Sequence, residues 1–185
     1  MRWLGILLSR VARLFEASAV KKLVRDQGGA TAVEFALVAT PFIALLIAIL
    51  ETILVFFAQQ ELQTATSQAA RLIMTGQAQT QNMTAAQFQQ TVCADAVALL
   101  TCSGIYVNVQ KFSSFSGVSQ LNPVQNGTFN NATMNFSPGS PGDIVLVQVF
   151  YQWPVDLGPL GFTLANMNGN MRLLIGTAVF RNEPY

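Results

Sequence analysis

The 185-residue sequence contains no histidine, only two cysteines and few charged residues. Charged residues make up 10% of the chain, against about 25% in an average soluble domain, whereas hydrophobic residues make up 51%. The lack of histidine excludes sites that use an imidazole as base or metal ligand. A hydrophobic chain is not expected to be intrinsically disordered. Its net charge of +1 is too small to attract nucleic acid through a general positive potential. The composition indicates a membrane or envelope protein.

One long apolar stretch dominates the N-terminal third. Residues 35–50 carry no charge, and the wider stretch 30–58 is interrupted by few polar residues. Because a bilayer core of about 30 Å needs about 20 helical residues, this stretch is long enough to span it. Six of the ten Lys and Arg residues lie within residues 1–25, so the positive-inside rule places the N-terminus in the cytoplasm. The sequence predicts one span, with everything after about residue 58 exported.

The acidic residues of the exported part do not form a catalytic pattern. They are scattered and mostly lie next to turns: Glu61, Asp95, Asp143, Asp156 and Glu183. No phosphate-binding loop, nucleophile elbow or nucleotide fingerprint occurs. Two cysteines without histidine make a poor zinc site. We therefore expect no enzymatic activity, no catalytic residues, no metal and no cofactor.

The junction between the basic leader and the apolar stretch has an unusual order of residues. Residues 27–38 read QGGATAVEFALV, so the small residues precede the apolar stretch, whereas in a secretory signal peptide they follow it. Glu34 places a carboxylate at the edge of hydrocarbon, where an ionised group is costly unless it is paired or reaches water. Two interpretations of Glu34 stay open: a paired functional group, or an interfacial residue that extends to solvent.

A basic leader, a glycine, a glutamate five positions later and then an apolar helix resemble the processing region of type IV-like prepilins. The matching residues are Gly29, Ala30, Glu34 and Phe35. The resemblance implies that a prepilin peptidase cuts between Gly29 and Ala30 and removes residues 1–29. It also implies that Glu34 of one subunit neutralises the new α-amino group on Ala30 of its neighbour.

The resemblance extends to the TadE family of the tight-adherence (Tad) type IV pilus system, well over residues 27–77 and loosely beyond. It rests on EFALVATPF, Glu51, the Ala69-Ala70-Arg71 triplet and Thr75-Gly76. The family implies a minor pilin or pseudopilin acting in pilus assembly, adhesion or secretion. Two departures are the long leader and Ala30, where ordinary type IV pilins have a bulky residue.

The partners and location implied by the resemblance are specific. The partners are the membrane, a prepilin peptidase, other Tad pilins and assembly-platform proteins, with no nucleic acid. The location is the inner membrane, single-pass, with the C-terminal domain periplasmic and then in the extracellular pilus after processing. The alternative is an uncleaved signal-anchored envelope protein whose exported domain binds a partner in an inner-membrane or secretion complex.

Two further residues of the apolar stretch have candidate roles in assembly. Pro41 cannot donate a hydrogen bond to the carbonyl of Leu37, so we expect a kink or local opening, which is either a repacking point or a tolerated membrane proline. Glu51 follows about 31 Å along the helix from Ala30, near the outer interface. It is either a solvated boundary carboxylate or a contact for a partner helix.

The sequence patterns predict an α+β fold, and together with the leader that the resemblance implies they give five segments: 1–29, leader; 30–58, membrane part of a long helix; 59–76, its outer extension; 77–103, a second helix with a cysteine-containing turn; 104–185, a β-rich domain. An apolar stripe continues the long helix to about Thr75, where Gly76 ends it: Leu62, Ala65, Ala69, Leu72 and Ile73. Thr84 caps the second helix, with Phe88, Val92 and Ala96 on one face. Predicted strands are 105–110, 143–153 and 171–181, with a weaker one at 128–136; residues 113–128 are predicted to form a loop.

Cys93 and Cys102 are nine residues apart, which on one unbroken helix is about 13.5 Å and too far for a bond. A disulfide therefore requires the helix to end near Leu100 and the chain to turn at Ser103-Gly104. Because the exported compartment is oxidising, we favour a disulfide over two buried thiols.

Overall fold

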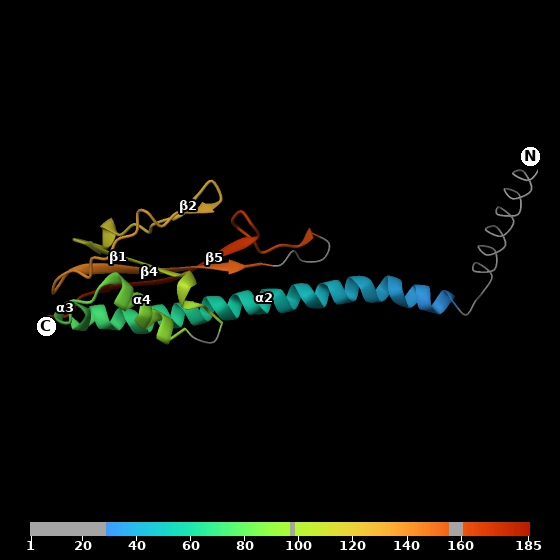
Figure 1. Cartoon of the computed structure of the whole chain (residues 1–185), viewed down its shortest axis with the longest axis horizontal. Helices are drawn as coiled ribbons and strands as arrows, with labels where there is room; N and C mark the ends of the chain where they lie inside the picture. Colours follow the sequence, from blue (N-terminus) through green and yellow to red (C-terminus); the bar gives the residue numbers. More distant parts are fainter. Residues whose placement is uncertain (1–28, 97–98, 156–160) are drawn as a thin grey trace, which may run out of the picture. The chain divides into compact units, whose positions relative to one another are not determined.

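The computed structural model describes residues 29–96, 99–155 and 161–185. The predicted leader, apart from Gly29, lies outside the described residues. The chain divides into two units, a first that ends at Leu46 and a second of Ile47–Tyr185. The secondary structure is a long helix, two short helices and a small antiparallel sheet (Figure 1), which confirms the predicted α+β fold.

The long helix α2 runs from Ala30 to Met74, 45 residues, and ends where the sequence predicted. The next glycine, Gly76, has a φ of 76°, a left-handed conformation that glycine adopts without steric cost. A Cβ at Gly76 would collide with the ring of Tyr185, so the C-terminus of the chain packs directly on this turn. The amide of Glu183 also donates to the carbonyl of Met74 at 2.9 Å, which satisfies one of the free carbonyls at the helix end.

Two short helices follow. The predicted cap of the second helix is confirmed: Thr84 precedes α4, Ala85–Ala94, and forms a reciprocal capping box with Gln87. The first short helix, α3 at Gln77–Thr80, was not predicted. The predicted end of α4 near Leu100 was wrong, because the helix stops at Ala94 and the amide of Ala96 turns back to the carbonyl of Cys93 at 3.0 Å.

The early end of α4 brings the two cysteines together. Cys93 lies in the last turn of α4 and Cys102 begins the short 3-10 helix η1, Cys102–Gly104. Their Cα atoms are 5.3 Å apart and the two residues are joined by a disulfide. The chain reverses between them, as the spacing required, but it reverses one to two turns earlier than the sequence suggested.

The sheet has three antiparallel strands in the order β1-β4-β5: β1 Ile105–Phe112, β4 Ile144–Pro154 and β5 Met171–Arg181. These correspond to the three stronger predicted strands. Residues 144–151 of the central strand β4 are all buried, since both faces of the sheet are covered.

Helices α2 and α4 cover one face of the sheet (Figure 1) and form the main core with it. The core takes alternate residues of each strand together with one stripe of each helix: Leu62, Ala65, Ala69 and Ile73 of α2, Phe88 and Val92 of α4, Ile105 and Val109 of β1, Val145, Val147 and Val149 of β4, and Leu174 of β5. This packing confirms the predicted stripe on the outer extension of α2, except that Leu72 is only half-buried.

The weak strand predicted at 128–136 was largely wrong. Only Thr128–Phe129 forms a strand, β3, which pairs in a hairpin with β2, Val124–Gln125. Asn126 and Gly127 make the two-residue turn with φ values of 51° and 74°, the conformation that an Asn-Gly pair favours. The ring of Phe129 packs 4.8 Å from that of Tyr106, centroid to centroid, so the hairpin covers the second face of the sheet.

Candidate functional site

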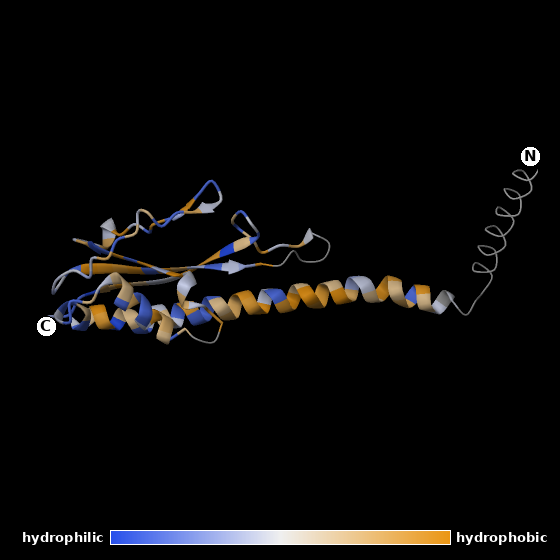
Figure 2. Cartoon of the chain, in the orientation of Figure 1, coloured by the Kyte–Doolittle hydropathy of each residue, from blue (hydrophilic) through white to orange (hydrophobic). Residues whose placement is uncertain are grey.

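The first part of α2 consists mainly of apolar residues (Figure 2), and most of their large side chains are exposed. Fifteen large side chains between residues 33 and 57 are 43% to 75% exposed: Val33, Phe35, Leu37, Val38, Phe42, Ile43, Leu45, Leu46, Ile47, Ile49, Leu50, Ile53, Leu54, Phe56 and Phe57. In water such a surface would be strongly unfavourable, whereas in lipid it is expected. Among the described residues one helix is long and apolar enough to cross a membrane, and this fits a single-pass membrane protein.

The candidate processing site lies where α2 begins. Gly29 is an exposed turn residue, and its carbonyl accepts the first helical hydrogen bond, from the amide of Val33 at 3.1 Å. The peptide bond to Ala30 therefore joins the last turn residue to the first helical residue. One helical turn later, Glu34 and Phe35 are both exposed. Within the described part of the chain, the carboxylate of Glu34 has no hydrogen-bond or ion-pair partner.

Two threonine hydroxyls farther along the apolar part of α2 are satisfied within the helix. The hydroxyl of Thr40 donates to the carbonyl of Ala36 at 2.7 Å, and that of Thr52 donates to Ala48 at 2.7 Å. Such bonds to the preceding turn allow threonine in hydrocarbon without an unsatisfied donor. Pro41, the residue after Thr40, lies inside α2 and does not end the helix.

Glu51 is half-buried on α2 and several turns from Glu34, so the helix does not bring the two acids together. Its Oε1 atom is covered and has no hydrogen-bond partner among the described residues. Of the two roles considered for Glu51, a solvated boundary carboxylate agrees with the partial exposure of the residue but not with its covered oxygen. A covered oxygen at this position was not predicted from the sequence.

A contact between α2 and the edge of the sheet was not predicted from the sequence. Gln59 exchanges two hydrogen bonds with the backbone of Ile175, at 2.9 and 3.3 Å, and Gln63 exchanges two with Thr177, both at 3.0 Å. Each side-chain amide thus pairs with the free edge of β5 as a neighbouring strand would. The spacing of the glutamines, one helical turn apart, was the available signal.

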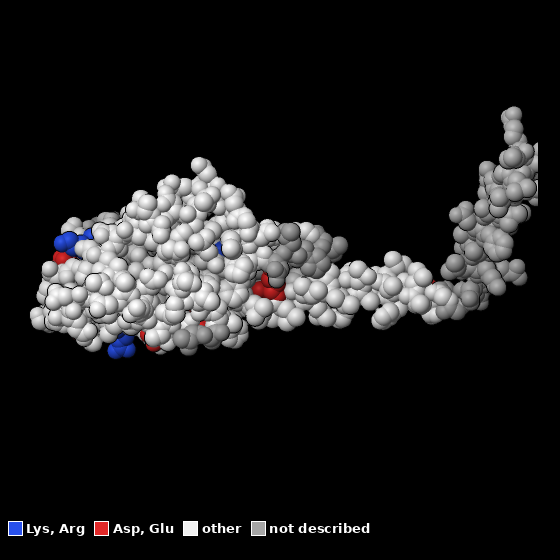
Figure 3. Space-filling view, in the orientation of Figure 1, with Lys and Arg blue, Asp and Glu red and all other residues white. Residues whose placement is uncertain are grey.

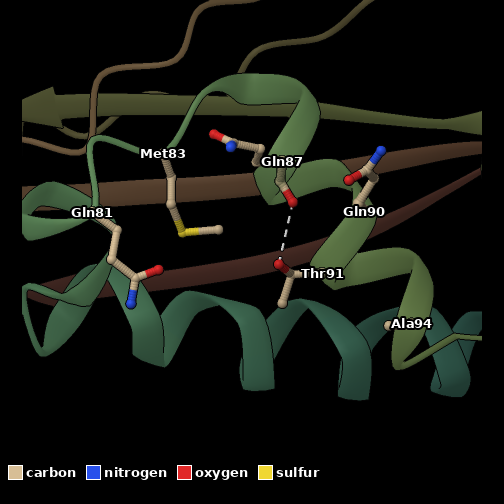
Figure 4. Close-up of a pocket in the computed structure, with 6 residues that line it drawn as sticks. All are labelled: Gln81, Met83, Gln87, Gln90, Thr91 and Ala94. Carbon is tan, nitrogen blue, oxygen red and sulfur yellow. Dashed lines mark hydrogen bonds between the residues drawn. The ribbon is translucent and has the colours of Figure 1, made fainter.

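The second unit, Ile47–Tyr185, which we call the outer unit, shows no arrangement suited to acid–base or metal chemistry among the described residues. A shallow depression of about 430 Å³ lies between α4 and the turn before it (Figure 4), lined by uncharged residues: Gln81, Met83, Gln87, Gln90, Thr91 and Ala94. Charged side chains are sparse on the face drawn in Figure 3. In the ranges that the structure describes, no group of three or more His, Cys, Asp or Glu residues is placed to hold a metal ion.

Comparison with known families gives one match. The family model described as TadE-like protein matches residues 29–71. The match begins at Gly29, the turn residue before α2, and ends within the last turns of that helix. No curated protein and no solved structure matches the chain.

Proposed function

We propose that this chain, with its TadE-like segment at residues 29–71, is a minor pilin or pseudopilin of a Tad-type pilus that acts in pilus assembly, adhesion or secretion. The match carries the proposal, because it coincides with the apolar helix and starts at the predicted cleavage position. The role is structural and not enzymatic. A folded outer unit of more than 100 residues suits a minor component that presents a domain beyond the helix.

A prepilin peptidase cuts between Gly29 and Ala30. The cut removes the carbonyl of Gly29, which accepts the hydrogen bond from the amide of Val33, and leaves a free α-amino group on Ala30. A positive charge at the N-terminus of a helix is unfavourable to the helix dipole, so the new ammonium needs a carboxylate partner.

The exposed carboxylate of Glu34 is that partner in the assembled state. In the described part of one subunit Glu34 has no partner, so in hydrocarbon it would remain an isolated charge. Pairing with Ala30 of a neighbouring subunit neutralises both groups and fixes the axial register of the two helices. The proposed partners are therefore other Tad pilins, together with assembly-platform proteins.

The proposed orientation is cytoplasmic for the leader and periplasmic for the outer unit. The support is the concentration of Lys and Arg before residue 26. The disulfide between Cys93 and Cys102 agrees with an oxidising compartment on the exported side.

The direct test is N-terminal sequencing and intact-mass analysis of the protein from membranes of cells with an active prepilin peptidase. We expect a chain that begins at Ala30. Replacing Gly29 with leucine should leave the leader in place and membrane insertion unchanged, whereas Gly28→Ala serves as the control that is still cut. A wild-type chain that retains Met1 would contradict processing and favour the uncleaved signal-anchored protein instead.

A further inference from the structure

A small cavity lies where the exposed apolar surface of α2 ends. It measures about 100 Å³ and is lined by Thr52, Val55, Phe56 and Gln59 of α2 together with Leu164 and Arg172. Phe56 is 70% exposed and belongs to the last apolar turn of the helix. The residues after 58 are Gln59, Gln60 and Glu61, so the cavity lies at the level where a bilayer would give way to water.

Arg172 supplies the positive charge in this cavity. It lies near the start of β5 and is half-buried, and its Nη1 donates to the carbonyl of Leu164 at 2.9 Å. A guanidinium has five N–H donors, and the hydrogen bond to Leu164 uses one of them, so among the described residues the others remain for another acceptor. Within the described ranges no carboxylate forms an ion pair with Arg172.

The combination of charge and position indicates the ligand. A guanidinium binds phosphate oxygens through two parallel hydrogen bonds, and arginines at a membrane interface extend toward headgroups. Here the guanidinium lines the same cavity as Phe56, an exposed ring at the end of the apolar surface that would contact acyl chains. A free anion would use only the guanidinium, whereas a phospholipid uses the guanidinium and the apolar rim together.

We propose that this cavity binds the headgroup phosphate of a phospholipid, with Arg172 as the phosphate ligand and Phe56 against the acyl chains. The inference rests on the proposed single-pass membrane location. An anionic lipid such as phosphatidylglycerol fits best, because its headgroup has no ammonium to oppose Arg172. The bound lipid would fix the depth of the outer unit at the membrane surface.

The test uses the full chain purified in a neutral detergent and titrated with phosphatidylglycerol, with bound lipid counted by native mass spectrometry. Arg172→Gln should weaken lipid binding about tenfold, the loss expected for charge-assisted hydrogen bonds. Arg181→Gln is the matched control, since Arg181 lies on the same strand and also donates to one backbone carbonyl, that of Gly142 at 3.0 Å. Arg181→Gln should leave lipid binding unchanged.

A second pair of variants keeps the test independent of the fold around Arg172. Phe56→Glu puts a negative charge on the rim and should also weaken lipid binding, whereas Phe57→Glu, which is similarly exposed but does not line the cavity, should not. Equal binding by Arg172→Gln and wild type would overturn the proposal. So would binding of inorganic phosphate alone with the same dependence on Arg172 and no advantage for the lipid.

The lipid assay is separable from the pilin assay. Cleavage at Gly29 and piliation do not enter the measurement, and loss of the lipid effect in a chain that is still processed would remove only this site. Conversely, normal Arg172-dependent lipid binding by a chain that is never cut would contradict the pilin role and leave this site intact.

Discussion

The two parts of α2 are one helix with two different surroundings. Between residues 31 and 54 almost every large apolar side chain is exposed, on all faces of the helix. Between residues 55 and 74 the exposed positions are mostly polar, and a single stripe is buried at spacings of three and four: Val55, Ala58, Leu62, Ala65, Ala69 and Ile73. The distribution of apolar residues around the helix axis therefore distinguishes the two parts. Apolar residues on all faces indicate an apolar environment, whereas a single apolar stripe indicates packing against one partner surface.

The exposed part and the packed part of α2 also differ in the size of their apolar side chains. The exposed part uses large residues such as Phe35 and Leu50, which gain from contact with lipid or with other helices. The packed part uses alanine at four of its buried positions, and β5 faces it with Gly176, so the helix backbone approaches the sheet closely. Changes in the first part should therefore affect insertion and assembly, and changes in the second should affect the stability of the outer unit.

The largest effect should come from Glu34, an exposed carboxylate near the start of this part of α2. Glu34→Leu should still insert, because an apolar residue lowers the cost of burial in lipid, and it should still be cut after Gly29. Assembly should fail, because the Ala30 ammonium would lose its counter-charge at a cost of about 3–5 kcal/mol. The measurement is piliation and co-purification with other pilins at wild-type protein levels.

Thr31→Val is the control for the change at Glu34, since it removes a polar group from the same exposed part without removing a charge. It should assemble normally. Normal piliation by Glu34→Leu would refute the pairing mechanism and identify Glu34 as an interfacial residue that reaches water.

The disulfide should matter only to the outer unit. Replacing both Cys93 and Cys102 with alanine should lower the free energy of unfolding by about 2–4 kcal/mol and leave membrane insertion unchanged. Alkylation of the mature protein without reduction should label neither thiol, and reduction should expose both. Labelling of both thiols in an unfolded, unreduced sample would contradict the bond.

Gly176 tests how closely the packed part of α2 approaches the sheet. A Cβ at this position would collide with the hydroxyl of Thr66 and lie 3.0 Å from the carbonyl oxygen of Leu62. Gly176→Ala should therefore lower the free energy of unfolding by about 2 kcal/mol. Unfolding of the full chain in detergent, monitored by near-ultraviolet circular dichroism, measures this change. Gly117→Ala is the control, because its methyl would meet only the Ser114 hydroxyl at 3.4 Å, and equal stability of the two variants would refute the packing argument.

Much of the fold could be predicted from local patterns. The end of α2 before Gly76, the cap at Thr84 and the strands β4 and β5 each have a local signal in the chain, namely a glycine, a capping box or a β-branched run. The end of α4 could not be predicted, because residues 95–100 contain neither glycine nor proline and four of the six are alanine or leucine, which are good helix formers. The hairpin at Asn126-Gly127 had a signal that was overlooked.

Some residues of the candidate sites could be predicted from the sequence and others could not. Gly29, Glu34 and Phe35 are recognisable because their order along the chain matches a processing motif, and the family match starts at the first of them. The cavity at Arg172 could not be predicted, since its lining comes from segments more than 100 residues apart. The contacts of Gln59 and Gln63 with the sheet edge could not be predicted either, since their partners lie more than 100 residues later in the chain.

The smallest expected effect concerns one of those glutamines and the edge that it covers. Gln63→Leu removes both hydrogen bonds to Thr177 and should cost about 1 kcal/mol, since water replaces part of each bond at the exposed edge. In native-state hydrogen exchange the amide of Thr177 should lose protection, while that of Ile175, still bonded to Gln59, should keep it. Gln60→Leu, on the exposed side of the same turn, should change neither amide. Unchanged protection of Thr177 in Gln63→Leu would mean that this part of the sheet edge does not depend on the Gln63 amide.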